Sequence, residues 1–440
     1  MHVGCLMPKE RNVLLISYYW PPSGGAGVQR WLKMAKYLCR LGWKVTVYTP
    51  DNPDFYQLDP TLLDDVPAEV VTLKRRIIEP NRWLSRRGAK RAGVGLLQEG
   101  GQRQGLLYRL ALWLRANVFV PDARMLWIGP SVRYLKRWLK EHPQSALITT
   151  GPPHSMHMIG LRLHRMTGLP WMADFRDPWT NIDYAHHMPM IAWARGRQAR
   201  MERDVVREAN VVLAVTPGMQ AEYEALRGRP VQLVMNGFDE EDIEPRGPMP
   251  EASGAAFTLL HLGSLNADRN PHLLWQTLQR LVQEGKLVPG SMRVQLVGSV
   301  DDSVRTEVSR LGLDAFVEML PSMPHSAVMQ RLQGASALLL CINATPNSKG
   351  ILTGKLFEYL ASRRPIVSIG PRDGDAARIV REAQAGSTFD ADDADALGEH
   401  LIHLVELHHR GALGDTQGDL QAYSRRMQAE CISHLLEEML

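Results

Sequence analysis

Cysteine is scarce in this sequence. The 440 residues include four cysteines, Cys5, Cys39, Cys341 and Cys431, which lie far apart and form no CxxC pair. A disulfide framework or a zinc finger needs paired or clustered cysteines. The spacing therefore excludes the common zinc-finger motifs and predicts a reduced, cytoplasmic protein.

Long apolar segments are also lacking. The longest runs, such as residues 13–16 and 335–342, are far shorter than the roughly 20 residues that a membrane-spanning helix needs. The first ten residues contain Pro8, Lys9 and Glu10 and no apolar core of a secretion signal. We therefore expect a cytoplasmic protein that contacts a membrane, if at all, from its inner face.

The dinucleotide fingerprint GxGxxG is missing as well. After Gly25 and Gly27, the position of the third glycine is occupied by Arg30. The third glycine of that motif allows close packing of helix on strand. Its absence argues against a nicotinamide-dependent dehydrogenase.

What is present is the composition of a folded α/β protein. Apolar residues make up 45% of the chain and charged residues 22%, which is typical of a globular protein. A chain of 440 residues is too long for one ordinary core, so two domains of about 200 residues each are expected.

Positive charge is concentrated in one window. Between Lys74 and Arg115 there are eleven Lys and Arg residues and two acids, Glu79 and Glu99, although the net charge of the whole chain is only +4. Cations mixed with leucine and tryptophan favour an anionic lipid surface, each contributing about 1 kcal/mol. A solvated loop followed by an ordinary amphipathic helix is the alternative. No nucleic-acid-binding motif accompanies the charge.

Short β-rich runs alternate with helical patterns along the chain, as in parallel sheets built from βαβ units. The predicted strands are residues 13–17, 45–49, 146–150, 171–173, 211–215, 231–235, 257–262, 294–297, 337–341 and 366–369. Helical spacing covers residues 28–38 and 419–440, and acids, prolines and glycines mark residues 236–256 as a linker. We predict an α/β fold with two doubly wound, Rossmann-like domains, residues 11–240 and 255–415, which face a central cleft. A C-terminal helix within residues 416–440 is expected to pack back across them.

Each predicted domain has a glycine-bearing turn between a strand and a helix. The first contains Gly24, Gly25 and Gly27, and the second runs from Gly350 to Gly354. Backbone amides in such turns approach a phosphate without hindrance from a Cβ atom, and the helix start that follows favours negative charge. Tight packing is the alternative reason for such glycines. Two such turns predict an enzyme that holds a nucleotide diphosphate.

Several segments, in this order, resemble the bacterial GT4-type glycosyltransferases of the GT-B fold. The resemblance covers residues 12–440 and rests on YYWPPSGGAGVQRW from Tyr18, NGFD from Asn236, HLGSL from His261 and GKLFEYLA from Gly354, followed by PIV from Pro365. It implies transfer of a sugar from a nucleotide-diphospho-sugar, with retention of anomeric configuration and without a bound metal or other cofactor.

The resemblance also implies roles in the second domain. Glu358 matches the glutamate that accepts hydrogen bonds from the ribose hydroxyls of the donor. Lys355, three residues earlier on the same helix face, and Arg269 are candidates to neutralise the departing diphosphate. Gly350 stands where the family commonly has a first glutamate, and Ser264 stands where it usually has an arginine. We therefore expect Ser264 and the amides of Gly350, Ile351, Leu352 and Thr353 to contribute to donor binding, with those of Gly24 and Gly25.

In the first domain, candidate side chains follow two predicted strands. His154 is expected to orient the acceptor hydroxyl or contact the transferred sugar, since its pKa lies near the working pH. The alternative is that His154 or Ser155 caps the next helix. Asp174 and Arg176 are predicted to bind the acceptor and Asp177 to act near the reacting centre. Structural ion pairing is the alternative for this acidic and basic cluster.

The predicted function is a retaining hexosyltransferase that uses a UDP- or GDP-sugar and a glycan or lipid-linked glycan acceptor. Bacterial envelope polysaccharide assembly, at the cytoplasmic face of the membrane, is the expected setting. Two alternatives remain: a sugar-nucleotide epimerase of the same fold, and a non-catalytic sugar-nucleotide-binding subunit at the membrane, which the missing first glutamate allows.

Overall fold

The computed structural model describes residues 10–55, 58–79, 106–182, 188–242, 256–323 and 325–440. The chain divides into two compact units. The first contains Met1–Gly237 together with Tyr423–Leu440, and the second contains Phe238–Ala422. Most of the predicted linker and residues 80–105 of the basic window lie outside the described residues.

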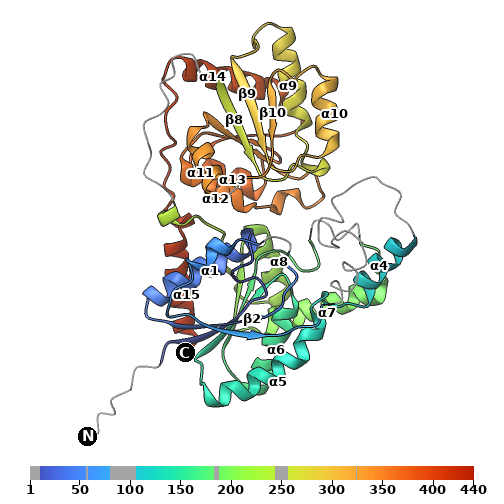
Figure 1. Cartoon of the computed structure of the whole chain (residues 1–440), viewed down its shortest axis with the longest axis vertical. Helices are drawn as coiled ribbons and strands as arrows, with labels where there is room; N and C mark the ends of the chain where they lie inside the picture. The colour runs from blue at the N-terminus through green and yellow to red at the C-terminus, as the bar shows by residue number, and fades with distance from the viewer. Residues whose placement is uncertain (1–9, 56–57, 80–105, 183–187, 243–255, 324) are drawn as a thin grey trace. The chain divides into compact units, whose positions relative to one another are not determined.

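The first unit is built on a seven-stranded parallel sheet (Figure 1). Its strands are β1 (Asn12–Ile16), β2 (Lys44–Pro50), β3 (Val71–Arg75), β4 (Ala146–Gly151), β5 (Trp171–Phe175), β6 (Val211–Ala214) and β7 (Gln232–Leu233), in the order β3-β2-β1-β4-β5-β6-β7. Its helices are α1 (Ala26–Arg40), α4 (Leu106–Asn117), α5 (Met125–Glu141), α6 (Ser155–Thr167), α7 (Ala192–Glu208), α8 (Pro217–Arg227) and α15 (Arg425–Glu438).

Both faces of this sheet are buried. Successive side chains of a strand point to opposite faces, so Leu14 and Ile16 join the core under α5 to α8 while Val13 and Leu15 join the core under α1 and α15. A strand that is covered on both faces reads as a continuous apolar run. This is why β1, β4 and β5 could be predicted from sequence.

The C-terminal helix α15 completes the first unit. Its apolar residues Ile432 and Leu436 belong to the same core as Trp31 of α1, and Trp43 Nε1 donates a hydrogen bond of 2.9 Å to Ser433 Oγ. The prediction of one helix from residue 419 was wrong at its start. Ser424 Oγ accepts from the backbone N–H of Met427 at 3.1 Å, and this cap makes α15 begin at Arg425.

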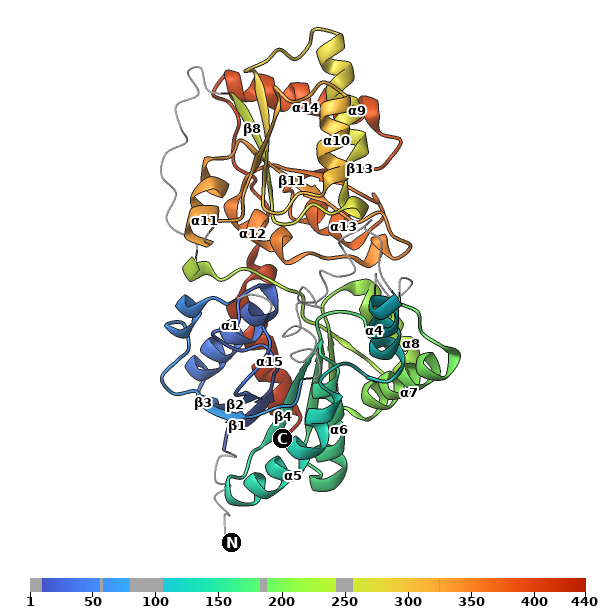
Figure 2. The ribbon, with the colours of Figure 1, turned by 45° about the vertical axis from the view of Figure 1, so that its right-hand side comes forward.

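The second unit is built on a six-stranded parallel sheet (Figure 2). Its strands are β8 (Phe257–Leu262), β9 (Met292–Val297), β10 (Val317–Leu320), β11 (Ala337–Cys341), β12 (Ile366–Ile369) and β13 (Gly386–Phe389), in the order β10-β9-β8-β11-β12-β13. Its helices are α9 (His272–Gln283), α10 (Asp302–Arg310), α11 (His325–Gly334), α12 (Gly354–Ser362), α13 (Asp375–Glu382) and α14 (Ala394–His409). The prediction of two doubly wound parallel sheets is confirmed.

Three edge strands, β3, β10 and β13, were not predicted from the sequence. No residue of β3 or β10 is buried, and Phe389 is the one buried residue of β13. An edge strand that is partly exposed lacks the continuous apolar run of a central strand, so its pattern resembles that of a loop.

Each sheet has one point at which the strand order reverses. In the first unit, β1 lies between β2 and β4, and in the second unit β8 lies between β9 and β11. Ligands of doubly wound sheets bind beyond the carboxyl ends of the strands at such switch points. The segments that follow β1, β4, β8 and β11 are therefore where a site is expected.

Among the helices in the described part of the chain, none is both long enough and apolar enough to cross a membrane.

Candidate functional site

A lysine lies against the backbone at the switch point of the second unit. Strand β8 ends at Leu262, and Gly263 follows with φ of 91°. A Cβ atom on Gly263 would lie 3.3 Å from Lys355 Nζ, so glycine allows the amine to approach the main chain. Gly298, after β9, has φ of 132°, and a Cβ atom there would lie 2.7 Å from Gly263 O. The absence of side chains at Gly263 and Gly298 thus allows close contacts at the carboxyl ends of β8 and β9.

His261, fully buried on β8, contacts this lysine. Its Nδ1 lies 2.9 Å from Leu339 O and its Nε2 lies 3.4 Å from Lys355 Nζ. Burial, and then the nearby Lys355, hold the pKa of His261 well below its usual value, so the ring is neutral. The Nδ1–H therefore donates to the carbonyl, and the Nε2 lone pair accepts from the lysine amine.

Lys355 has a strongly perturbed pKa. Burial, and then the charge of Arg269, lower it to about 7, while Cys341 and Glu358 act in the opposite direction. Among the described residues, no carboxylate forms an ion pair with Lys355. An amine that is buried beside a second cation favours binding of an anion, because the anion would repay the desolvation of the ammonium group.

Arg269 lies at the same switch point. It closes a short 3-10 turn after β8, and its Nε donates to Asn343 Oδ1 at 2.7 Å while Nη1 donates to Ser264 O at 3.1 Å. Asn343 follows β11, so the Arg269 guanidinium connects the segment after β8 to the segment after β11. The structure brings the predicted residues Ser264, Arg269 and Lys355 together.

The remaining predicted donor residues lie on or just before α12. Gly350 closes a 3-10 turn, Ile351 and Leu352 follow it, and Thr353 is the residue before the helix. The Thr353 hydroxyl makes no cap and is a buried oxygen without a hydrogen-bond partner in the described structure. Glu358 lies one turn beyond Lys355 and is half-buried. In the described structure no side chain caps the start of α12, of which Lys355 is the second residue.

In the first unit, Gly25 has φ of 87° and immediately precedes α1. This helix begins at Ala26, two residues before the predicted start at Val28. Arg30 of this helix is fully buried, and its Nη2 forms an ion pair of 2.8 Å with Asp174 Oδ1, which is also fully buried. Asp174 Oδ2 accepts from Trp31 Nε1 at 2.6 Å and from Thr150 Oγ1 at 2.9 Å.

These contacts favour the structural alternative for Asp174, and its acceptor role stays a prediction that nothing here tests. Both carboxylate oxygens are used inside the protein, and no part of the side chain reaches solvent. A buried carboxylate in this position joins α1, β4 and β5. The structural ion pair that was the alternative exists, although its cation is Arg30 rather than the neighbouring Arg176.

Arg176 connects the loops that follow β1 and β4. Its Nη1 donates to Gly27 O at 3.2 Å, its Nη2 donates to Pro152 O, and its guanidinium lies 5.6 Å from the ring centre of Tyr19. These contacts give Arg176 a role in shaping the edge of the sheet. Asp177 is exposed. The acceptor role of Arg176 and the catalytic role of Asp177 stay predictions.

His154 directly precedes α6, three residues after the end of β4, and stacks on Trp179, with ring centres 4.4 Å apart and planes at 5°. Its Nδ1 is buried and has no hydrogen-bond partner in the part of the chain that the structure describes, and a Cβ atom on Gly151 would lie 3.0 Å from this nitrogen. Burial, and then His157, hold the pKa of His154 well below its usual value. His154 is therefore a neutral ring with an unused hydrogen-bonding atom.

The cap expected from His154 or Ser155 is made by a different residue. Asp122 Oδ2 accepts from the backbone N–H of Ser155 at 2.8 Å, and Asp122 Oδ1 accepts from Ser155 Oγ at 2.8 Å. A carboxylate 33 positions away thus caps α6. This arrangement leaves the His154 ring available.

His157, one turn further along α6, was missed by the sequence prediction. Trp171 Nε1 donates to Thr149 Oγ1 at 2.9 Å, and Thr149 Oγ1 also shares a hydrogen bond of 2.8 Å with His157 Nδ1. His157 Nε2 is buried without a hydrogen-bond partner among the described residues, and a Cβ atom on Gly151 would lie 2.6 Å from it. Nothing in the local sequence distinguishes His157 from a core histidine, because its partners come from other strands.

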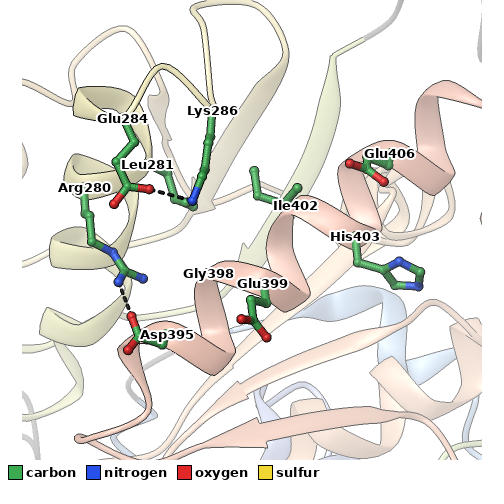
Figure 3. A pocket seen from close by; sticks show the side chains of 10 residues that line it. All are labelled: Arg280, Leu281, Glu284, Lys286, Asp395, Gly398, Glu399, Ile402, His403 and Glu406. Atoms are coloured by element: carbon green, nitrogen blue, oxygen red, sulfur yellow. Dashed lines mark hydrogen bonds and ion pairs between the residues drawn. The ribbon is translucent and has the colours of Figure 1, made fainter.

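A separate hollow of about 460 Å³ lies between α9 and α14 and contains none of the predicted site residues (Figure 3). Four of its charged side chains form pairs, Arg280 with Asp395 and Lys286 with Glu284, and the carboxylates of Glu399 and Glu406 also line it. Carboxylates outnumber cations in this lining, which does not suit a negatively charged diphosphate. The switch points, and not this hollow, hold the candidate site.

Comparison with known families identifies both units. A family model described as a glycosyl transferase 4-like domain matches residues 24–237, and one described as glycosyl transferases group 1 matches residues 256–407. No curated protein sequence is similar enough to count as a match.

Several solved structures share the fold. Sucrose-phosphate synthase from Thermosynechococcus elongatus is 13% identical with a TM-score of 0.60, covering 98% of this chain and 99% of that chain. The lipopolysaccharide outer core galactosyltransferase WaaB is 14% identical with a TM-score of 0.56, covering 98% and 100%. HepE from Anabaena, solved in complex with UDP-glucose, is 14% identical with a TM-score of 0.58, covering 97% and 99%. The two family models span most of both units, and the chain therefore belongs to the GT4-type glycosyltransferases of the GT-B fold.

Proposed function

We propose that this glycosyltransferase transfers a hexose with retention of configuration, from a nucleotide-diphospho-sugar to a glycan or lipid-linked glycan. The observation that carries the proposal is Lys355, a half-buried amine that forms no ion pair with a carboxylate of the described residues and lies beside Arg269 at the switch point of the second unit. The proposed setting is envelope polysaccharide assembly in a bacterium, at the inner face of the membrane.

In this proposal the second unit binds the donor. Lys355, Arg269 and the first amides of α12 stabilise the negative charge that develops on the diphosphate as the sugar leaves. These fixed cations would supply the charge stabilisation that a metal ion provides in other enzymes. Glu358 accepts hydrogen bonds from the ribose, and Ser264 and Gly350 to Thr353 bind the sugar and phosphates.

The first unit is proposed to recognise the acceptor. His154 offers a neutral imidazole whose Nδ1 has no partner within the described structure, and Asp177 is exposed nearby in sequence. Arg176 holds the loops around His154. The leaving phosphate is the proposed base, so the acceptor oxygen attacks from the face that the diphosphate leaves.

Nucleotide screening tests the donor site. Two cations and a helix start favour a diphosphate over a monophosphate, so UDP-, GDP- or dTDP-sugars should raise the melting temperature and a CMP-sugar should not. A ligand at 100 times its Kd stabilises the protein by about 2.7 kcal/mol. Equal stabilisation by the CMP-sugar would contradict a diphosphate site.

The stabilising donor is then incubated with and without candidate acceptors. Release of nucleoside diphosphate that depends on the acceptor supports transfer, and NMR of the product anomeric proton reports retention. Isomerised donor in the absence of acceptor would instead identify an epimerase. Binding with no reaction in either case would identify a non-catalytic subunit.

Donor affinity is expected to weaken as the pH rises through about 7. Lys355 is protonated below its pKa, and a bound diphosphate favours the charged amine and so raises that pKa. Above pH 7 binding therefore takes up one proton, and Kd increases by up to about tenfold per pH unit until the pKa of the complex is reached.

Calorimetry with the same sugar nucleotide, from about pH 6 to about pH 8, measures this slope. Lys355→Arg is the matched control, because a guanidinium stays charged over the whole range. The arginine variant should bind without the slope. A slope that survives in this variant would assign the proton to another group.

A further inference from the structure

Exposed apolar side chains gather on two helices of the first unit. They are Leu110, Trp113, Leu114 and Val118 at α4, and Ile191 and Trp193 at the start of α7, with exposed fractions from 38% to 60%. Both exposed tryptophans of the described residues belong to this set. We call these six residues the α4–α7 patch.

The apolar residues of α4 form a single stripe that faces outward. Leu110, Trp113 and Leu114 are spaced by three and four residues, and Val118 follows at the same spacing, so they share one face of the helix. A helix at the surface of a globular protein normally turns such a stripe toward the core. Here the stripe remains exposed.

A buried asparagine joins the two parts of the patch. Asn117 Nδ2 donates to Trp113 O and to Pro189 O, both at 2.9 Å, and Asn117 Oδ1 accepts from the N–H of Ile191 at 2.8 Å. Figure 1 and Figure 2 both show α4 next to α7. These hydrogen bonds therefore tie the end of α4 to the start of α7, the two segments that carry Trp113 and Trp193.

The charge around the patch is positive. Residues 106–120 contain two arginines and no acid, and residues 188–203 contain four arginines and one acid, Glu202. Glu202 is buried and accepts from Thr180. Arg195 and Arg200 are exposed, and the Arg197 guanidinium lies 5.3 Å from the ring centre of Trp193. Exposed tryptophan, leucine and arginine together suit the boundary between lipid headgroups and acyl chains.

The patch is linked to the His154 site through α7. Gln198 of this helix donates through Nε2 to Pro121 O at 2.9 Å and accepts through Oε1 from Trp179 Nε1 at 2.7 Å. Trp179 is the residue on which His154 stacks. The helix that carries Trp193 therefore also supports one wall of the proposed acceptor site.

We propose that the α4–α7 patch is an interfacial binding site for an anionic lipid bilayer. The apolar residues enter the headgroup region and the arginines pair with lipid phosphates. Of the lipid surface predicted between Lys74 and Arg115, this site includes only the α4 portion, and it adds α7, which the charge count did not indicate. The proposal does not depend on donor chemistry, so its test stands whether or not sugar transfer is shown.

Co-sedimentation of the full chain with vesicles tests the proposal. One set of vesicles contains phosphatidylcholine alone, and the other contains equal amounts of phosphatidylcholine and phosphatidylglycerol. The protein is expected to pellet with the anionic set, and raised salt should weaken binding because it screens the arginines. Protein that stays in the supernatant with anionic vesicles would overturn the proposal.

Two double variants separate this patch from other surfaces. Trp113→Ala with Trp193→Ala, and Arg195→Glu with Arg200→Glu, should each lower the partition coefficient by at least about tenfold. Val288→Ala and Arg310→Glu are the matched controls, since both residues are exposed in the second unit. These controls should bind as the unaltered protein does. Equal binding by all four variants would place the lipid contact elsewhere and refute the patch.

Discussion

Replacing Lys355 with methionine is expected to lower the turnover number by at least about two orders of magnitude. The amine is a half-buried cation at the switch point of the donor unit, and its loss removes charge stabilisation that matters most when the diphosphate leaves. Steady-state kinetics with the donor found by screening measures the effect. Glu358→Ala should cause a loss of similar size, through its ribose contact.

The same Lys355→Met variant should be at least as stable as the original protein. Burial opposes the charged amine, and the described residues supply no carboxylate partner, so a methionine of similar length removes a desolvation cost. A site that is selected for binding commonly sacrifices stability in this way. Thermal unfolding checks the expectation and separates loss of function from loss of fold.

Lys349→Ala is the matched control for these variants. Lys349 lies in the segment before α12, is exposed, and forms an ion pair of 2.5 Å with Asp373. Its loss should change turnover by no more than about twofold, because an exposed ion pair contributes little. Unchanged kinetics in both Lys355→Met and Glu358→Ala would overturn the donor-site assignment.

Replacing Asp174 with alanine is expected to reduce the free energy of unfolding by about 3–5 kcal/mol. The substitution leaves the Arg30 guanidinium buried without its carboxylate and removes the acceptor of the Trp31 and Thr150 hydrogen bonds. Urea denaturation followed by circular dichroism measures the change in the first unit. Asp177→Ala, at an exposed position, should change the same quantity by less than about 0.5 kcal/mol.

A compensating variant tests the cause of this loss. Arg30→Met combined with Asp174→Leu removes both charges and should recover part of the stability, because well-packed apolar residues can replace a buried ion pair. The backbone carbonyls of Val234 and Met235, which accept from Arg30, would remain unpaired and limit the recovery. A stability of Asp174→Ala close to that of the unaltered protein would show that the ion pair contributes little.

The sequence alone predicted the central strands and the fold class. Strands such as β1 and β11 are continuous apolar runs because both of their faces are covered, and this pattern is local. The motifs around Gly354–Ala361 indicated the same family that the two family models show. Edge strands and the cap of α15 were missed, because partial exposure and a single serine give weak local patterns.

The sequence also showed that Arg30 breaks the dinucleotide motif, and it named Lys355 and Arg269 as candidates. It could not show that Arg30 pairs with a carboxylate 144 positions away, or that His261 and Asn343 hold the two candidate cations. Periodicity and turn chemistry depend on near neighbours in the chain, so they can be read directly. Burial, charge pairing and the pKa of a buried amine depend on residues that only folding brings into contact, so the tertiary structure alone decided which charged residues support the fold and which remain available to a substrate.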